Sequence, residues 1–441
     1  MKFNMRKFFC FVIVSLFCFS FTYFVTPVSG DEIWNYGFGY NIAFGLVPYR
    51  DFNMVLTPLY SMFVSIFIRL FGHHLYSIHI FNSIILSSLI LICYHKLGIK
   101  SLLFFPFIFL VSYPGYNLFC VFVMILLLVL LDSNLKRKDT IIAFLVGLLF
   151  LTKQTIGVCL FLPMMYYSKN KIKDLFVFLI PILLLIIYLL VNNALYDFIN
   201  YCFLGLFEFC DSNKIYMFLI IEIVVCLIII FYFVKSKFKN KKLFYILMFQ
   251  VVTVPIIDDY HFMIGLLPVL YYFLLVIKIP KFKIKYYFIM VCYFCFMLDF
   301  HVQGYGFEQF YSDKTSYLYG RNVSTFLEDK TLKITKYIDN IKDDYDYVYL
   351  FSSVSYYIKL NANYPLSKYD LINNGNMGYN GANRYIDEID SFCANNKCAF
   401  ILNKYEIPAD GYVQTNIDIL NHIPEHYSLV DNVDNFDIYT N

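Results

Sequence analysis

Long apolar stretches joined by short polar connections make up most of the first 300 residues of the chain. A helix needs roughly 17–25 apolar residues to cross a bilayer. We interpret eleven of these stretches as membrane-spanning helices, at 8–26, 74–95, 101–113, 116–131, 140–152, 155–168, 174–191, 215–234, 243–257, 262–277 and 286–300. Residues 56–71 are apolar too, and we interpret them as a helix lying on the membrane surface.

The basic residues decide the orientation of these helices, because cytoplasmic connections carry an excess of Lys and Arg. With residues 56–71 on the surface, the predicted inner connections up to residue 300 hold 20 basic residues and the outer ones hold four. A full span at 56–71 would invert this distribution. The pattern therefore predicts a cytoplasmic N-terminus and an external C-terminus. A signal peptide cleaved near residues 28–30 is the alternative for the first stretch, and it also places Asp31 outside.

From about residue 301 the chain becomes polar. Residues 345–351 and 399–402 have the composition of buried strands, and residues 382–392 have a helical pattern. We therefore expect a transmembrane core at 1–300, with a first external loop at 27–73. A small extracytoplasmic α/β domain then follows at 301–441. Cys393 and Cys398 share this domain, and a disulfide between them is left open.

Composition supports a membrane protein: 60% of the residues are hydrophobic and 15% are charged. Soluble domains have about 25% charged residues. The basic residues fall in short clusters between apolar stretches, which gives no nucleic-acid-binding surface. We expect a multi-pass protein of the plasma membrane that contacts membrane lipid and no nucleic acid.

The first external loop contains an acidic pair, Asp31 and Glu32, followed by aromatic residues at helical spacing from Trp34 to Phe44. This stretch is too polar to span the bilayer and predicts a helix along the surface, with its rings at headgroup level. Adjacent carboxylates near a low dielectric repel each other, which raises the pKa of one and makes it a usable general base. The alternative is that Asp31 only caps the helix.

Two basic residues are candidate anion ligands on the outer side. Lys153 lies between two short apolar stretches, where a buried charge is costly unless it faces an anion or a polar cavity. We interpret it as a phosphate ligand, with a lysine that reaches to the interface as the alternative. Arg50 is a second candidate cation, although it could instead pair with the adjacent Asp51.

The sequence Asp258-Asp259-Tyr260-His261 lies at the outer end of another predicted span. Two carboxylates and an imidazole could bind a divalent cation or the hydroxyls of a sugar. They could equally form a solvated turn between helices. We make no firm prediction of a metal site.

No histidine cluster, Gly-rich phosphate loop or Ser-His-Asp set is recognisable in the sequence. His73 and His74 are adjacent and would diverge by about 100° on a helix, so with His79 they make no convincing metal site. The predicted cytoplasmic connections are too short to bind a nucleotide. An enzyme on the outer face then needs an activated donor delivered through the membrane.

Several of these motifs resemble the GT-C glycosyltransferases, the polyprenyl-phosphate-sugar-dependent enzymes related to protein O-mannosyltransferases and to the aminoarabinose transferases of lipid A. The resemblance lies in the Asp-Glu pair after the first span, Gly-x-x-Pro-Tyr-Arg-Asp-Phe at 45–52, Thr-Pro-Leu at 57–59 and Phe-Gly at 71–72. Leu-Thr-Lys at 151–153 and Asp-x-Tyr-His at 258–261 are also similar to motifs of bacterial members. The resemblance implies a GT-C-like core and an external active site.

The resemblance further implies that Asp31 is the general base for an acceptor hydroxyl, and that Glu32 orients the acceptor or the base. Lys153 and Arg50 would bind the phosphate of the donor, with His261 assisting. Such a reaction requires no cofactor, although Asp258 and its neighbours leave room for a divalent cation. The acidic pair lacks a following Lys-Pro, so the sugar and the acceptor of the aminoarabinose enzymes are not transferred to this chain.

The sequence therefore favours an inverting hexosyl- or pentosyltransferase that moves a sugar from polyprenyl phosphate to an envelope glycan, lipid or protein. A polymerase or ligase of lipid-linked oligosaccharides is the first alternative, and it would use a diphosphate-linked donor. A flippase or transporter of lipid-linked sugars is the second. A transporter would have charges along a path through the membrane and related halves, whereas acidic residues are rare in the predicted spans, Glu222 being an exception.

Overall fold

The computed structural model of the protein describes residues 5–26, 28–207, 217–254, 258–277, 309–310, 317–323, 325–352, 355–370, 372, 376–404 and 417–441. The chain divides into two compact units. Unit 1 contains the described residues of Met1–Glu32, Tyr76–Leu185 and Ile215–Phe307. Unit 2 contains those of Ile33–Leu75, Ile186–Lys214 and Glu308–Asn441.

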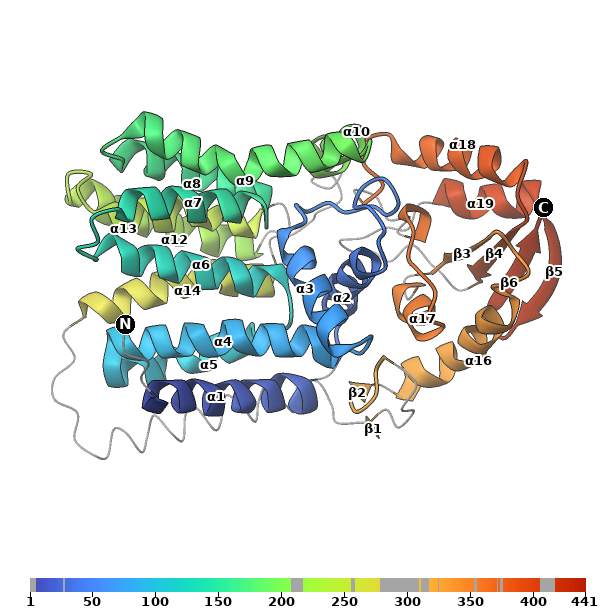
Figure 1. Ribbon diagram of the computed structural model, residues 1–441, viewed down its shortest axis with the longest axis horizontal. Helices are drawn as coiled ribbons and strands as arrows, with labels where there is room; N and C mark the ends of the chain where they lie inside the picture. The colour runs from blue at the N-terminus through green and yellow to red at the C-terminus, as the bar shows by residue number, and fades with distance from the viewer. Residues whose placement is uncertain are drawn as a thin grey trace. The chain divides into compact units, whose positions relative to one another are not determined.

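Unit 1 is built from helices that pack side by side (Figure 1). They are α1 (Met5–Ser20), the π-helix η1 (Phe21–Val25), α4 (Tyr76–Leu97), the 3-10 helix η2 (Gly98–Leu103), α5 (Phe105–Leu110), α6 (Tyr116–Leu131), α7 (Lys138–Phe150), α8 (Gln154–Tyr167), α12 (Met217–Lys235), α13 (Lys241–Phe249), the 3-10 helix η4 (Gln250–Thr253) and α14 (Asp259–Val276). Neighbouring pairs include α1 with α4, α4 with α6, α6 with α7, α7 with α8, and α8 with α13.

Helix α6 is the centre of unit 1, because it packs against α4, α7, α13 and α14. Its sequence is apolar all round, as expected for a helix covered by protein on every side, and most of its residues are buried. Helix α12 contrasts with it, since Ile220, Leu227 and Phe231 are largely exposed. Apolar surface of this kind needs a lipid or protein cover, and a bilayer provides it.

Among the described residues, four helices are long and apolar enough to cross a membrane: Met5–Val25, Tyr76–Leu103, Lys171–Val191 and Phe218–Lys235. The shorter apolar helices include Tyr116–Leu131 and Tyr260–Val276. The predicted membrane character is confirmed. The count of eleven spans and the orientation stay predictions, and the predicted span at 286–300 lies outside the described residues.

Unit 2 contains helices from three parts of the chain. They are α3 (Leu59–Phe71), α10 (Leu195–Ile199), the π-helix η3 (Asn200–Leu204), α16 (Thr325–Ile341), α17 (Ser355–Asn361), the 3-10 helix η5 (Lys368–Asp370), α18 (Gly381–Cys393) and α19 (Ile417–His426). Two helices run from one unit into the other, α2 (Gly30–Ala43) and α9 (Lys171–Val191). The predicted domain boundary near residue 300 therefore differs from this division, in which residues 33–75 and 186–214 group with the C-terminal part.

The sequence predicted that the aromatic residues from Trp34 to Phe44 lie at the membrane surface. Phe44 is 50% exposed, but most of the rings within α2 are buried instead. Tyr36, Phe38 and Tyr40 are at most 3% exposed. Protein covers them because α2 can be approached closely at its glycines. A Cβ atom at Gly39 would lie 2.4 Å from the side chain of Val64, and one at Gly37 would lie 2.5 Å from Leu366. Helix α2 is thus an internal helix of unit 2 from residue 33 onward.

The C-terminal part confirms the predicted α/β fold. Its sheet has the order β3-β4-β6-β5, formed by β3 (Tyr347–Phe351), β4 (Cys398–Asn403), β5 (Ser428–Val433) and β6 (Phe436–Thr440). Strands β3 and β4 are parallel, and the other two pairs are antiparallel. The short strands β1 (Gln309–Phe310) and β2 (Asn322–Val323) form a separate antiparallel pair.

Alternate residues of the central strands bury opposite faces of this sheet. Val348 and Leu350 pack with Ile334, Ile338 and Ile358 of α16 and α17. On the other face, Tyr349 and Phe351 join a cluster that includes Ile389 of α18 and Ile423 of α19. The result is a sheet between two layers of helices.

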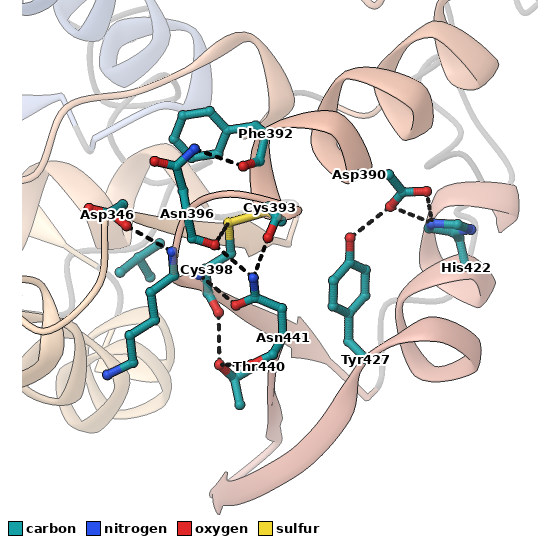
Figure 2. Close-up of a disulfide and its surroundings, with 12 residues drawn as sticks. Asp346, Asp390, Phe392, Cys393, Asn396, Cys398, His422, Tyr427, Thr440 and Asn441 are labelled. Carbon is teal, nitrogen blue, oxygen red and sulfur yellow. Dashed lines mark hydrogen bonds and ion pairs between the residues drawn. A yellow bond between two sulfur atoms is a disulfide. The ribbon is translucent and has the colours of Figure 1, made fainter.

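Cys393 and Cys398 form a disulfide that joins the end of α18 to the start of β4 (Figure 2). The C-terminal residue supports this corner, since the backbone N–H of Cys398 donates to Asn441 Oδ1 at 2.9 Å. Figure 2 also shows Asp390 accepting hydrogen bonds from His422 at 2.9 Å and Tyr427 at 2.7 Å, which ties α18 to α19. The pairing that the sequence left open is present.

Candidate active site

Asp31 and Glu32 lie in the first turn of α2, which begins at Gly30. The hydroxyl of Ser29 accepts a hydrogen bond from the backbone N–H of Glu32 at 3.1 Å. This is the bond that an N-cap residue makes to the third residue of a helix. Ser29 therefore supplies the N-cap of α2, and Asp31 does not.

Asp31 as a residue is exposed, yet protein packs around its carboxyl group. This burial raises the pKa of Asp31 above its ordinary value. The positive charge of His261 opposes the rise, and the negative charge of Asp258 adds to it. Asp31, Asp258 and His261 are therefore close enough to interact electrostatically within unit 1. A carboxyl group with a raised pKa on an exposed residue has the properties of a general base.

Asp258 and His261 form a pair at the start of α14. Asp258 is the N-cap, and its Oδ1 accepts from the backbone N–H of His261 at 2.7 Å and from the His261 ring at 2.8 Å. Burial alone would raise the pKa of Asp258, but the bonds from His261 outweigh it and lower this pKa. An ionised Asp258 keeps a proton of His261 on Nδ1, so Nε2 is an acceptor whenever the ring is neutral.

The amide of Asn117, in the first turn of α6, lies next to that nitrogen. Its Nδ2 atom is 3.5 Å from His261 Nε2, a long contact that sets which end of the amide faces the imidazole. The other end, Oδ1, is buried and has no hydrogen-bond partner among the described residues. Asn117 is 3% exposed, so this oxygen is a buried acceptor whose hydrogen-bonding capacity the described protein does not use.

Lys153 lies in the connection between α7 and α8, with an extended backbone just before Gln154. The turn is tight because Gly157 faces the backbone of Phe150, and a Cβ atom there would lie 2.3 Å from Phe150 Cα. Lys153 as a whole is 6% exposed. It donates to the carbonyl of Val252 at 2.9 Å and lies 5.8 Å from the centre of the Tyr116 ring.

Burial lowers the pKa of Lys153 to about 8, although the negative charge of Asp258 works in the opposite direction. The ammonium remains mostly protonated at neutral pH. It has three N–H donors, of which the Val252 carbonyl takes one. A buried cation with this spare capacity fits an anionic ligand better than a lysine that reaches into solvent.

Glu32 points away from this group and pairs with His79 of α4. Its Oε1 is 2.7 Å from His79 Nε2, and neither side chain has any exposed surface. His79 Nδ1 is in turn 3.1 Å from the hydroxyl of Thr22 in η1. The sequence did not identify His79, because nothing along the chain connects it to a carboxylate 47 residues away.

The other predicted site residues have different surroundings. Tyr260 packs its ring 6.4 Å from that of Tyr113 and 5.5 Å from that of His261. The side chain of Asp259 lies outside the described residues. Arg50 belongs to unit 2 and forms two bonds with its neighbour Asp51, at 2.7 and 2.9 Å. Its interpretation as a partner of Asp51 is therefore confirmed.

Metal binding finds no support in the part of the chain that the structure describes, where no three His, Cys, Asp or Glu side chains are arranged to hold an ion. Asp258 and His261 bond to each other instead. The divalent cation considered from the sequence stays an untested prediction.

Two crystal structures of ArnT from Cupriavidus metallidurans are similar to this chain, one bound to undecaprenyl phosphate and one in the apo state. Each has a TM-score of 0.53 and 10% sequence identity, and the match covers 99% of this chain and 98% of ArnT. The chain has the GT-C fold. The GT-C resemblance drawn from short motifs is therefore confirmed at the level of the fold. No protein-family model matches the sequence, and no curated protein does.

Proposed function

We propose that this protein is a membrane glycosyltransferase that moves a sugar from a polyprenyl-phosphate carrier to an envelope glycan, lipid or protein on the outer face of the membrane. One observation carries the proposal: on a GT-C fold, unit 1 contains a carboxyl group with a raised pKa, Asp31, and a buried lysine with spare donors, Lys153, and the charge of Asp258 acts on both. The similar ArnT structure bound to undecaprenyl phosphate supports a lipid-phosphate donor.

In the proposed reaction, the Asp31 carboxylate takes the proton from a hydroxyl of the acceptor. The acceptor oxygen forms a bond to C1 of the sugar while the bond from C1 to the phosphate oxygen breaks. Attack from the face opposite the phosphate inverts the anomeric centre. Both electrons of the broken bond leave with the polyprenyl phosphate. The raised pKa of Asp31 makes it a stronger base than an ordinary carboxylate.

The leaving group gains negative charge as the bond to C1 breaks, so a cation fixed beside it lowers the barrier. Lys153 is the residue that we assign to this task, because its ammonium is protonated, buried and bonded only once to the described protein. Arg50, the second cation considered from the sequence, bonds to Asp51 within unit 2, and we assign it no task here. His261 would assist by balancing charge near Asp31.

The Oδ1 atom of Asn117, which has no hydrogen-bond partner among the described residues, can accept a hydrogen bond from a hydroxyl of the bound sugar or of the acceptor substrate. The orientation of the Asn117 amide depends on the Asp258–His261 pair, because an unprotonated His261 Nε2 faces the Nδ2 end of the amide. A hydroxyl supplied by substrate would satisfy a buried polar atom that otherwise lowers stability. Asp258, His261 and Asn117 therefore form the proposed polar wall of the substrate site.

Lipid-linked intermediates distinguish this proposal from its alternatives. We would extract lipids from an intact strain and a deletion strain and measure them by mass spectrometry. A glycosyltransferase of the proposed kind leaves a monophosphate-linked single sugar to accumulate in the deletion strain, while one sugar disappears from the envelope. Accumulation of a diphosphate-linked oligosaccharide would overturn the proposal in favour of a polymerase or ligase.

A further inference from the structure

The Glu32–His79 pair is fully enclosed, and nothing in the proposed reaction uses it directly. Both side chains have 0% exposed surface and meet at 2.7 Å. The edge of the Tyr23 ring covers the imidazole, with the ring centres 5.2 Å apart. A substrate cannot reach a carboxylate in this position without displacing the packing around it. Glu32 is therefore unsuited to bind the acceptor.

The pair connects three separate segments of unit 1. Glu32 is in the first turn of α2, His79 is in α4, and Thr22 is in η1. The Thr22 hydroxyl lies 3.0 Å from the carbonyl of Cys18, to which it donates, so its oxygen accepts from His79 Nδ1 at 3.1 Å. Each polar atom along this line has a partner, which makes the arrangement rigid.

Asp31 is the residue next to Glu32 in the same turn. Consequently, whatever fixes Glu32 also fixes the backbone from which the Asp31 carboxylate projects. We propose that Glu32 and His79 are positioning residues, which lock the first turn of α2 to η1 and α4 and thereby hold Asp31 in place beside Asp258 and His261. This inference rests on the proposed role of Asp31. Of the two roles that the resemblance implied for Glu32, it favours orienting the base over orienting the acceptor.

A hydrogen bond between residue 32 and His79 Nε2 does not require a negative charge on residue 32. With a proton on His79 Nδ1, Nε2 accepts a hydrogen bond from a neutral donor, and the amide of glutamine provides one at the same length. We therefore expect Glu32→Gln to retain most of the activity. Glu32→Ala and His79→Ala should each lower kcat by about 100-fold through misplacement of the base, with the donor KM little changed.

Asn82 offers a matched control in the same helix. It is fully buried, one turn after His79, and its Nδ2 donates to the carbonyl of Ser112 at 2.8 Å. Asn82→Ala removes a buried hydrogen bond of α4 that does not reach α2. We expect it to leave kcat much closer to that of the intact protein than His79→Ala does.

The test combines activity with hydrogen–deuterium exchange of the full-length protein in detergent. We expect faster exchange at the amides of residues 31–34 in Glu32→Ala and His79→Ala, and unchanged exchange there in Glu32→Gln and Asn82→Ala. The double variant Glu32→Ala, His79→Ala should be no slower than either single variant, because the two residues act as a unit.

Two results would overturn the inference. A loss in Glu32→Gln as large as that in Asp31→Asn would mean that Glu32 itself reacts. Unchanged exchange at residues 31–34 in His79→Ala would mean that the pair does not fix this turn. The exchange measurement needs no substrate, so it separates failure of this inference from failure of the proposed function.

Discussion

The ring of His261 donates to Oδ1 of Asp258 at 2.8 Å, while the backbone N–H of His261 bonds the same oxygen at 2.7 Å. One carboxylate thus caps α14 and fixes the tautomer of the histidine. These two tasks can be separated, because asparagine caps a helix about as well as aspartate does. A neutral amide, in contrast, places no negative charge beside the His261 ring.

Replacement of Asp258 by Asn should therefore leave the stability of the protein close to normal and lower kcat/KM by up to about 100-fold. The measurement is steady-state kinetics alongside the thermal midpoint of unfolding in detergent. His261→Gln serves as the reference, and the double variant should be no slower than His261→Gln alone. If the double variant instead lost kcat/KM by the product of the two single losses, Asp258 would not act through His261.

The pH dependence of kcat/KM should show the raised pKa of Asp31. Its carboxyl group must be ionised to act as a base, so activity rises with pH, with its acid limb above the ordinary aspartate value of about 3.9. Because protonated His261 lowers this pKa, His261→Gln should move the acid limb to higher pH. An acid limb that does not respond to His261 would argue against Asp31 as the titrating group.

The raised pKa of Asp31 also makes the free energy of unfolding depend on pH. The folded protein holds the Asp31 proton more tightly than the unfolded chain does. The contribution of Asp31 to the free energy of unfolding therefore declines as the pH rises from the ordinary to the raised pKa. Asp31→Asn removes this decline, and thermal midpoints measured across the acid range detect the difference.

Lys153 should matter for the reaction and not for stability. A buried ammonium opposes folding, so Lys153→Met should keep or raise the thermal midpoint while it lowers kcat by about 100- to 1,000-fold. In the intact protein, affinity for the donor should fall as the pH rises through about 8, where Lys153 loses its proton. Full activity of a well-folded Lys153→Met variant would remove Lys153 from the site.

Asn117 gives a prediction that depends on one oxygen atom. A buried acceptor without a partner costs about 1–3 kcal/mol of stability. Asn117→Leu removes such an acceptor, so the thermal midpoint should not fall. It should nevertheless lower kcat/KM about tenfold, by loss of one hydrogen bond to substrate. Asn117→Asp keeps the acceptor and is the matched control. Equal activity of the Leu variant and the intact protein would mean that no substrate hydroxyl binds there.

The sequence was informative where a property depends on neighbouring residues. Apolar stretches, the strands of the C-terminal sheet, and the separate motifs of Asp31, Lys153 and His261 could all be read along the chain. Partners from distant segments could not. His79 is 47 residues from Glu32, and Asn117 is 144 residues from His261. Polar residues in apolar helices were the available signal, although they do not indicate which partner they face.

The α2 helix shows a different limit of sequence analysis. Aromatic residues at helical spacing predict an apolar helix, and they do not distinguish a lipid surface from a protein interior. The deciding feature was Gly39, whose missing side chain leaves room for Val64. A close approach of this kind depends on the tertiary structure, so the burial of Tyr36 and Phe38 could not be predicted.

The central claim is that Asp31 is the base of a glycosyl transfer, and one measurement tests it most directly. Envelope glycans are compared by mass spectrometry in the intact strain, the deletion strain and the deletion strain that carries Asp31→Asn at normal expression. We predict that deletion removes one sugar and that Asp31→Asn does not restore it, since loss of the base lowers the rate by about 100- to 10,000-fold. Full restoration of the sugar by Asp31→Asn would contradict the account.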